Sequence, residues 1–197
     1  MLNVYIDFKC PASYLALRPT LALTGRLGVR ASWRAYSSAE RETPAEGADP
    51  AVIASHQRVR EASVREIHAR CAERQGLDMR FDGPRRSADL ALGALEGIDG
   101  DRTGFVTAAF EAFWRDQADL DDEAAVSALI RQTGTAPQGA VAAARARLEA
   151  AQSEAENIGV FATPIYVLGD LDDQLFWGRE HLPWIEEILT AELSSAT

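Results

Sequence analysis

A cysteine followed by a proline, where a predicted strand meets a predicted helix, is the residue pattern with the clearest chemical potential in this chain. Residues Leu2 to Phe8 alternate apolar and less apolar side chains, which predicts a strand. Pro11 suits the first position of a helix, because its φ is already helical and no N–H is needed there. Cys10 is therefore expected at the helix N-terminus, where unpaired N–H groups and the helix dipole favour a thiolate, the nucleophilic form of cysteine.

The alternative for Cys10 is a structural role, since free cysteine is often buried as a small apolar side chain. The strand–Cys–Pro–helix order favours the catalytic interpretation, because this placement supplies an electropositive helix end. Ser13 stands where a Cys-x-x-Cys motif would have its second cysteine. The motif Cys10-Pro11-Ala12-Ser13 therefore cannot resolve a mixed disulfide within the chain.

Three segments follow one another over nearly the whole chain: Asp7 to Ala16, Gly159 to Val167 and Leu175 to Leu182. Together they resemble the DsbA-like thioredoxin-fold superfamily, and within it the 2-hydroxychromene-2-carboxylate isomerases and kappa-class glutathione transferases. Two positions depart from the family pattern. Cys10 stands where these isomerases have a serine that stabilises the glutathione thiolate, and His181 stands where an arginine is usual.

The resemblance implies a glutathione-dependent enzyme that is either an isomerase or a thiol-disulfide oxidoreductase. Its catalytic residues are expected to be Cys10 and Ser13. Glutathione is expected to contact residues from all three segments: Pro11, Thr163, Pro164, Gly178, Arg179 and Glu180. A small-molecule substrate and a homodimer are also implied by the resemblance.

The same resemblance implies how these residues would act. The Thr163–Pro164 peptide bond is expected to be cis, with the Thr163 main chain pairing with the tripeptide and the Glu180 carboxylate facing its amine. In an isomerase, the glutathione thiolate would add reversibly to an unsaturated substrate and permit bond rotation. In an oxidoreductase, Cys10 would attack a disulfide and a second glutathione would release the product. The alternative from another class is a non-catalytic thioredoxin-like binding module.

The predicted fold class is α/β, a thioredoxin-like fold with a large all-helical insertion between the second and third strands. A helix over Pro11 to Leu27 followed by a strand over Val29 to Ala35 predicts a parallel strand pair with a right-handed crossover. Residues 1–50 and 158–197 are expected to form the thioredoxin-like domain, and residues 51–157 the inserted helical domain. The last elements are predicted to be strands at Ile165–Leu168 and Gln174–Trp177, joined through residues 169–173, and an amphipathic helix from Leu182.

Within the insertion, the apolar pattern and the helix stop signals predict several helices. They cover Ala51–Gln75, Asp101–Arg115, Asp121–Thr133 and Pro137–Ile158. The aromatic stripe from Phe105 to Trp114 is interpreted as core. The polar stretch from Ser37 to Pro50 is predicted to be a mobile loop near Cys10 that could cover a substrate.

Composition excludes several classes of function. The 197 residues have 30 acidic and 20 basic side chains, a formal charge of −10, which argues against binding to a nucleic-acid backbone. No apolar run approaches the roughly 20 residues that span a bilayer, and no signal peptide precedes the first strand, so a cytoplasmic protein with reduced cysteines is expected. His68 and Cys71 lie one helical turn apart, but two ligands do not make a zinc site. No metal is therefore expected, and Cys71 is predicted to be buried beside Val64 and Ile67.

Overall fold

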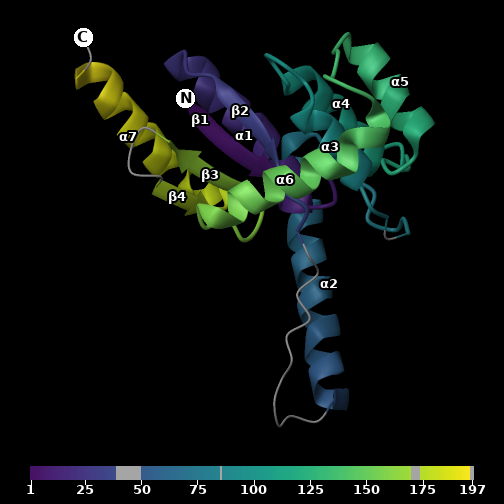
Figure 1. Ribbon diagram of the computed structural model, residues 1–197. Helices are drawn as coiled ribbons and strands as arrows, with labels where there is room; N and C mark the ends of the chain where they lie inside the picture. The colour runs from purple at the N-terminus through teal and green to yellow at the C-terminus, as the bar shows by residue number, and fades with distance from the viewer. Residues whose placement is uncertain (39–49, 85, 170–173, 196–197) are drawn as a thin grey trace.

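The computed structural model describes residues 1–38, 50–84, 86–169 and 174–195. Its centre is a four-stranded sheet in the order β2-β1-β3-β4 (Figure 1). The strands are β1 (Leu2–Ile6), β2 (Ala31–Ala35), β3 (Ile165–Leu168) and β4 (Gln174–Trp177). Strand β1 runs parallel to β2 and antiparallel to β3, so that Tyr5 lies opposite both Arg34 and Ile165. The parallel β1–β2 pair and the bounds of β3 and β4 agree with the predictions.

Helices cover both faces of the sheet. Helix α1 (Pro11–Leu27) connects β1 to β2 and ends at Gly28, whose positive φ of 65° suits glycine. It packs on the face that carries Tyr166, which hydrogen-bonds Thr20 of α1, and α7 (Leu182–Ser195) contributes its apolar side to the same core. On the opposite face, Ala155 of α6 (Ala144–Asn157) packs against Tyr5.

The insertion between β2 and β3 is helical, as predicted. It contains α2 (Pro50–Gln75), α3 (Asp89–Glu96), α4 (Thr103–Trp114), α5 (Glu123–Thr133), the short η1 (Val141–Ala143) and α6. The aromatic stripe of α4 is core, since Phe105 and Phe110 are fully buried. The ring of Phe110 meets that of Phe8 edge to face, with centroids 5.1 Å apart. The insertion is thereby packed against the segment that follows β1, two residues before Cys10.

Two parts of the insertion differ from the sequence-based expectation. Helix α3 was not predicted, because every residue from Leu90 to Leu95 is buried and such a short helix has no polar face to create a periodic pattern. The helix predicted from Pro137 begins later, because Pro137 pairs with Ile98 in an isolated β-bridge. Most of the loop predicted over residues 37–50, and residues 170–173 of the β3–β4 connection, lie outside the described residues.

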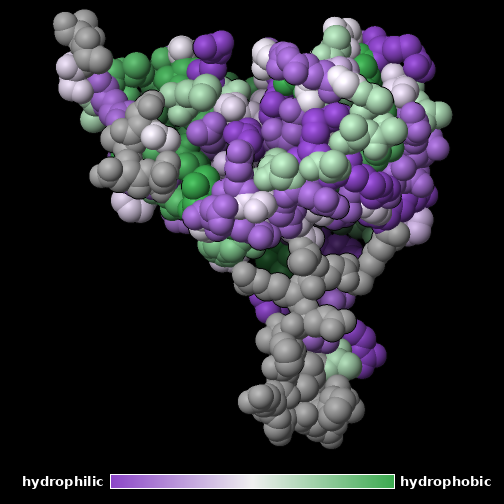
Figure 2. Space-filling view, in the orientation of Figure 1, coloured by the Kyte–Doolittle hydropathy of each residue, from purple (hydrophilic) through white to green (hydrophobic). Residues whose placement is uncertain are grey.

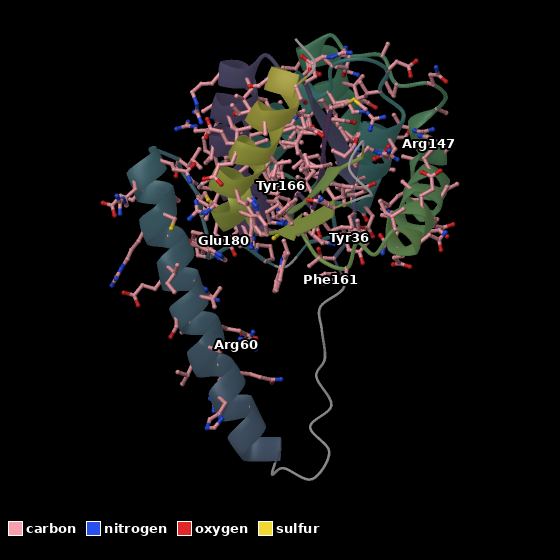
Figure 3. The ribbon with its side chains drawn as sticks, turned by 90° about the vertical axis from the view of Figure 1, so that its left-hand side faces the viewer. Tyr36, Arg60, Arg147, Phe161, Tyr166 and Glu180 are labelled. Atoms are coloured by element: carbon pink, nitrogen blue, oxygen red, sulfur yellow. The ribbon has the colours of Figure 1, made fainter. Side chains whose placement is uncertain are left out.

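Helix α2 projects from the body and touches it only near its C-terminal end in the views of Figures 1 and 3. Val64 is 41% exposed and Ile67 is 57% exposed. The prediction that Cys71 is buried beside them is therefore wrong, since Cys71 itself is only half-buried. The helix that carries it is too far from the body at Val64 and Ile67 to bury these side chains.

The surface of the body is mostly hydrophilic over α4, α5 and α6 in the view of Figure 2, and hydrophobic side chains appear nearer the sheet. Among the described residues, no helix combines the length and the apolar character that crossing a bilayer requires.

Candidate active site

Cys10 occupies the N-terminus of α1, as the sequence predicts. It is the N-cap residue, with an extended backbone (φ −83°, ψ 114°), and Pro11 is the first helical residue. The Cys10 carbonyl accepts the N–H groups of Ser13 and Tyr14 at 3.1 and 3.3 Å, and its own N–H donates to the Asp7 carbonyl at 3.0 Å. The side chain is half-buried, so the sulfur is held at a helix N-terminus and is still partly accessible.

The Cys10 sulfur lies against the segment that enters β3. Its thiol donates a hydrogen bond to the Thr163 carbonyl, with Sγ and O 3.4 Å apart. The Thr163–Pro164 peptide bond is cis, and both residues are buried. Because β1 and β3 are antiparallel neighbours in the sheet, the segment after β1, which has Cys10, and the segment before β3, which has Pro164, lie at the same end of the sheet.

A buried carboxylate connects the segments that surround the sulfur. Asp7 accepts the N–H of Lys9 on one oxygen and the N–H of Ser38 on the other, each at 2.9 Å. The Ser38 hydroxyl in turn shares a 2.9 Å hydrogen bond with the Thr163 hydroxyl. Asp7 therefore fixes the Lys9–Cys10 segment and the segment after β2 relative to the cis-proline segment.

The electrostatics around Asp7 involve one cation and a second acid. The Asp7 side chain is 1% exposed, and burial raises its pKa although the Lys9 ammonium, 3.6 Å away, opposes this effect. The ammonium also donates to Ser37 Oγ at 2.9 Å and lies 3.5 Å from the Asp89 carboxylate. Burial would raise the pKa of Asp89, but its hydrogen bond from Ser37 and the charge of Lys9 lower it. The sequence did not predict this network. Among its residues, only Asp7 could have been noticed, because it begins the first segment that resembles the family.

The turn after β4 forms a further side of the site. The Gly178 N–H donates to the Pro164 carbonyl at 2.9 Å, which brings the turn against the cis-proline segment. Gly178 has a φ of 93°, and a side chain there would displace the Glu180 carboxylate that folds back over it. Both features favour glycine.

Arg179 is engaged within the protein. Its guanidinium donates to the Leu15 carbonyl at 3.4 Å and to Cys71 Sγ at 2.9 Å. It therefore ties the turn after β4 to α1 and α2. Burial and the charge of Arg179 both lower the pKa of His68. Since a guanidinium occupies this corner, the pair of His68 and Cys71 is a poor place for a metal cation.

The structure brings most of the predicted site residues together, but their exposures differ. Cys10, Pro11, Thr163, Pro164 and Gly178 form one contiguous group through the contacts above. The Ser13 side chain is fully buried beneath it and accepts the Asp7 N–H at 3.4 Å. Glu180 is exposed beside the base of α2 (Figure 3).

An apolar surface that the sequence did not predict adjoins this group. Phe161 is 46% exposed and Trp177 is 55% exposed, and their rings meet edge to face with centroids 5.5 Å apart. Trp177 precedes Gly178 and lies opposite Ile165 in the sheet, and Phe161 lies two residues before Thr163. The aromatic pair therefore borders the same segments as the sulfur, where it can contact the apolar part of a bound molecule.

The arrangement combines three kinds of group within one region. It has a partly accessible thiol at a helix N-terminus, main-chain groups of a cis-proline segment and an exposed carboxylate. The thiol suits attack on a disulfide or an electrophilic carbon. Main-chain groups and a carboxylate suit a peptide-like ligand that has a free amine.

Comparison with protein families and curated proteins gives matches along most of the chain. The family of DSBA-like thioredoxin domains matches residues 1–190. A curated relative, 2-hydroxychromene-2-carboxylate isomerase of Sphingobium xenophagum, is 27% identical over 95% of this chain and 97% of its own length.

Solved structures share the fold. A 2-hydroxychromene-2-carboxylate isomerase superposes with a TM-score of 0.76 at 18% identity, over 99% of this chain and 97% of the other. The cytosolic disulfide reductase DsbM of Pseudomonas aeruginosa, solved with GSH, superposes with a TM-score of 0.59 at 17% identity, over 99% and 98% of the two chains. The sheet with its helical insertion is thus the expected thioredoxin-like α/β fold.

Proposed function

The chain belongs to the family of DSBA-like thioredoxin domains, and we propose that it is a glutathione-dependent thiol-disulfide oxidoreductase that uses Cys10 as its nucleophile. The observation that carries this proposal is the position of the Cys10 sulfur, at the N-terminus of α1 and 3.4 Å from the Thr163 carbonyl. A helix N-terminus favours the thiolate that disulfide exchange requires.

The proposed reaction has two exchange steps. The Cys10 thiolate attacks one sulfur of a disulfide, forms a mixed disulfide and releases the other sulfur as a thiolate. Ser13 stands where a second cysteine would be, so a glutathione thiolate resolves the mixed disulfide. It attacks the sulfur that is bonded to Cys10, forms a new disulfide with that sulfur and releases the Cys10 thiolate. No second protein thiol is needed.

The residues around Cys10 fit glutathione by their chemistry. We assign the peptide part of glutathione to the main chain at Thr163 and Pro164, beside Pro11, and its amine to the exposed carboxylate of Glu180. Gly178 has no side chain, which leaves room for the Glu180 carboxylate that folds back over it. Arg179 is already hydrogen-bonded to Leu15 and Cys71, so we assign it the role of positioning the Gly178–Glu180 turn.

A second candidate activity is an isomerase, and the 27% identity to 2-hydroxychromene-2-carboxylate isomerase favours it. In that reaction the glutathione thiolate adds to an unsaturated substrate, a bond rotates and the thiolate leaves. The aromatic pair of Phe161 and Trp177 would contact the apolar part of such a substrate. Cys10 would then hold the glutathione sulfur through a hydrogen bond, as a serine can, and Cys10→Ser would retain activity.

Intact-mass measurement after incubation with oxidised glutathione tests the proposal. We expect one glutathionyl group per chain on Cys10, which free glutathione removes. Cys10→Ser should abolish the adduct, and the matched variant Cys71→Ala should keep it. If the wild type forms no adduct and calorimetry detects no glutathione binding, the proposal is wrong, and a non-catalytic binding module becomes the better interpretation.

We further propose that the reaction takes place in the cytoplasm. Both cysteines are free in the structure, and the cytoplasm keeps thiols reduced, so it supplies the free glutathione that the second exchange step uses. Fractionation of the source cells with detection of the native protein checks this assignment. Recovery outside the cytoplasm would contradict it without affecting the chemistry of Cys10.

A further inference from the structure

A proline inside helix α1 frees a main-chain acceptor. Pro19 lies in the interior of α1, and proline has no N–H to donate to the carbonyl four residues before it. The carbonyl of Leu15 therefore lacks its usual partner within the helix. Because Leu15 is buried, this carbonyl needs a hydrogen-bond donor from another part of the chain.

Two side chains that are distant in sequence donate to the Leu15 carbonyl. Gln75 Nε2, at the C-terminal end of α2, donates at 3.0 Å, and Arg179, in the turn after β4, donates at 3.4 Å. A carbonyl oxygen has two lone pairs, so these two donors fill it. The Leu15 carbonyl is therefore a shared contact of α1, α2 and the turn after β4.

The Arg179 guanidinium has a second acceptor at the base of α2. It donates to Cys71 Sγ at 2.9 Å, and Cys71 lies one helical turn before Gln75. Arg18 of α1 donates to the Gln75 carbonyl, which fastens the last residue of α2 to α1. The position of Arg179 therefore depends on the Leu15 carbonyl and on the attachment of α2.

Gln75 contributes this contact although its other polar atom is unsatisfied. Gln75 Oε1 is buried and has no hydrogen-bond partner among the described residues. A buried acceptor without a partner is destabilising, and an apolar side chain of similar size avoids this cost. The donor of Gln75, and not its contribution to stability, is therefore what favours glutamine at this position.

The turn that contains Arg179 carries groups of the candidate active site. Gly178 donates its N–H to the Pro164 carbonyl at 2.9 Å, and the His181 N–H donates to the Gly178 carbonyl at 3.4 Å. The exposed Glu180 carboxylate lies beside the base of α2 (Figure 3). A displacement of Arg179 would therefore change the position of this carboxylate relative to the cis-proline segment.

We propose that Pro19 and Gln75 are positioning residues of the candidate active site, and that they act on the Glu180 carboxylate. Pro19 leaves the Leu15 carbonyl free. Gln75 and Arg179 share this carbonyl, so the base of α2 and the turn after β4 are held as one unit. The identity of the ligand that meets Glu180 rests on the proposed function, whereas the coupling of α2 to the turn does not.

Two substitutions remove the coupling at different points. Pro19→Ala restores an N–H that competes for the Leu15 carbonyl, and it should displace the longer of the two bonds, which is that of Arg179. Gln75→Leu leaves α1 unchanged and loosens the base of α2, and with it the Cys71 acceptor, so it tests the proposal even if Pro19→Ala does not fold. Neither variant should unfold at a lower urea concentration than the wild type, because alanine suits a helix interior better than proline and leucine leaves no buried acceptor unpaired.

Hydrogen exchange of the protein without ligand measures the coupling. The amides of Gly178 and His181 should exchange about fivefold or more faster in both variants than in the wild type. Gln57→Leu makes the same change as Gln75→Leu at an exposed position of α2 and should leave the exchange of these amides unchanged. Unchanged exchange in a folded variant, or faster exchange that only follows a loss of overall stability, would overturn the proposal.

Titration calorimetry with glutathione tests the effect on the site. Both variants should raise the Kd about threefold, and neither should raise it further when combined with Glu180→Ala, because both act through this carboxylate. A wild type that does not bind glutathione would overturn the proposed function, and the exchange measurement would then decide the coupling alone. Equal affinity of the wild type and both variants, or losses that add to that of Glu180→Ala, would overturn the positioning role.

Discussion

The Cys10 thiol donates a hydrogen bond to the Thr163 carbonyl, with Sγ and O 3.4 Å apart across 153 positions of sequence. A thiolate has no proton to donate, so ionisation of Cys10 removes this bond. The Thr163 carbonyl then becomes available to a main-chain N–H of a peptide-like ligand. Activation of the nucleophile and preparation of the proposed glutathione site are thus linked through a single proton.

The first prediction concerns the relative reactivity of the two cysteines. Near neutral pH, Cys10 should react with iodoacetamide about tenfold or more faster than Cys71, because its sulfur lies at a helix N-terminus. Cys71 is half-buried and its sulfur already accepts a hydrogen bond from Arg179. Peptide mass spectrometry after timed alkylation measures both rates. In Cys10→Ser, the alkylation that remains belongs to Cys71. Equal rates in the native protein would contradict the assignment of Cys10 as the nucleophile.

The second prediction concerns the Glu180 carboxylate. Glu180→Ala should weaken glutathione binding by about 1 kcal/mol, roughly fivefold in Kd, if the exposed carboxylate pairs with the amine of the ligand. Glu149→Ala changes an exposed glutamate of α6 and should leave the affinity unchanged. Titration calorimetry of the wild type and both variants decides the question. The same loss in both variants would indicate a general effect of net charge.

The third prediction concerns the buried Asp7 carboxylate. Its folded-state pKa is raised by burial, so its contribution to stability is fully present below the unfolded pKa and is lost as pH rises through the folded pKa. The unfolding free energy of the wild type should therefore fall relative to that of Asp7→Asn as pH rises. Urea denaturation over a pH series from about 4 to 8 measures this difference.

Asp89→Asn provides a control of opposite sign. The pKa of Asp89 is lowered, because hydrogen bonding by Ser37 and the charge of Lys9 outweigh burial. Its contribution is present above the unfolded pKa and is lost as pH falls through the folded pKa. The two variants should therefore show opposite trends. Parallel trends would mean that Asp7 and Asp89 do not titrate as their surroundings indicate.

Much of the fold could be predicted from sequence because its signals are local. Pro11 and Gly28 mark the ends of α1, and the structure gives α1 the predicted bounds of Pro11–Leu27. The strands β3 and β4 also have their predicted bounds, because short apolar runs lie between turn residues. Helix α3 could not be found in this way, since its burial depends on neighbours that are distant in sequence.

The site was only partly predictable for the same reason. The Cys10–Pro11 motif marked the helix N-terminus, and the proline at position 164 marked the segment opposite it. The partners of Lys9, however, are Ser37 and Asp89, which no pattern associates with the motif. Likewise, the contact of Arg179 with Cys71 depends on how α2 attaches to α1. These contacts depend on tertiary packing, which a single sequence does not reveal.

The last prediction concerns a buried pair that joins the sheet to α1, Thr20 and Tyr166, of which Tyr166 is labelled in Figure 3. The Thr20 hydroxyl donates to the Ala16 carbonyl at 2.7 Å, so the phenol must donate the proton in the 2.9 Å bond between the two hydroxyls. Burial raises the pKa of Tyr166, which keeps this proton in place at neutral pH.

The two possible deletions of this bond should consequently differ in cost. Tyr166→Phe removes the donor and leaves Thr20 bonded to Ala16, so it should cost about 0.5–1.5 kcal/mol. Thr20→Val leaves the buried phenol without its acceptor and should cost more, about 1–3 kcal/mol. Thr190→Val, at an exposed position of α7, should change stability by less than about 0.5 kcal/mol. Urea denaturation of the three variants gives the order directly, and a larger loss for Tyr166→Phe than for Thr20→Val would show that the phenol is not the donor.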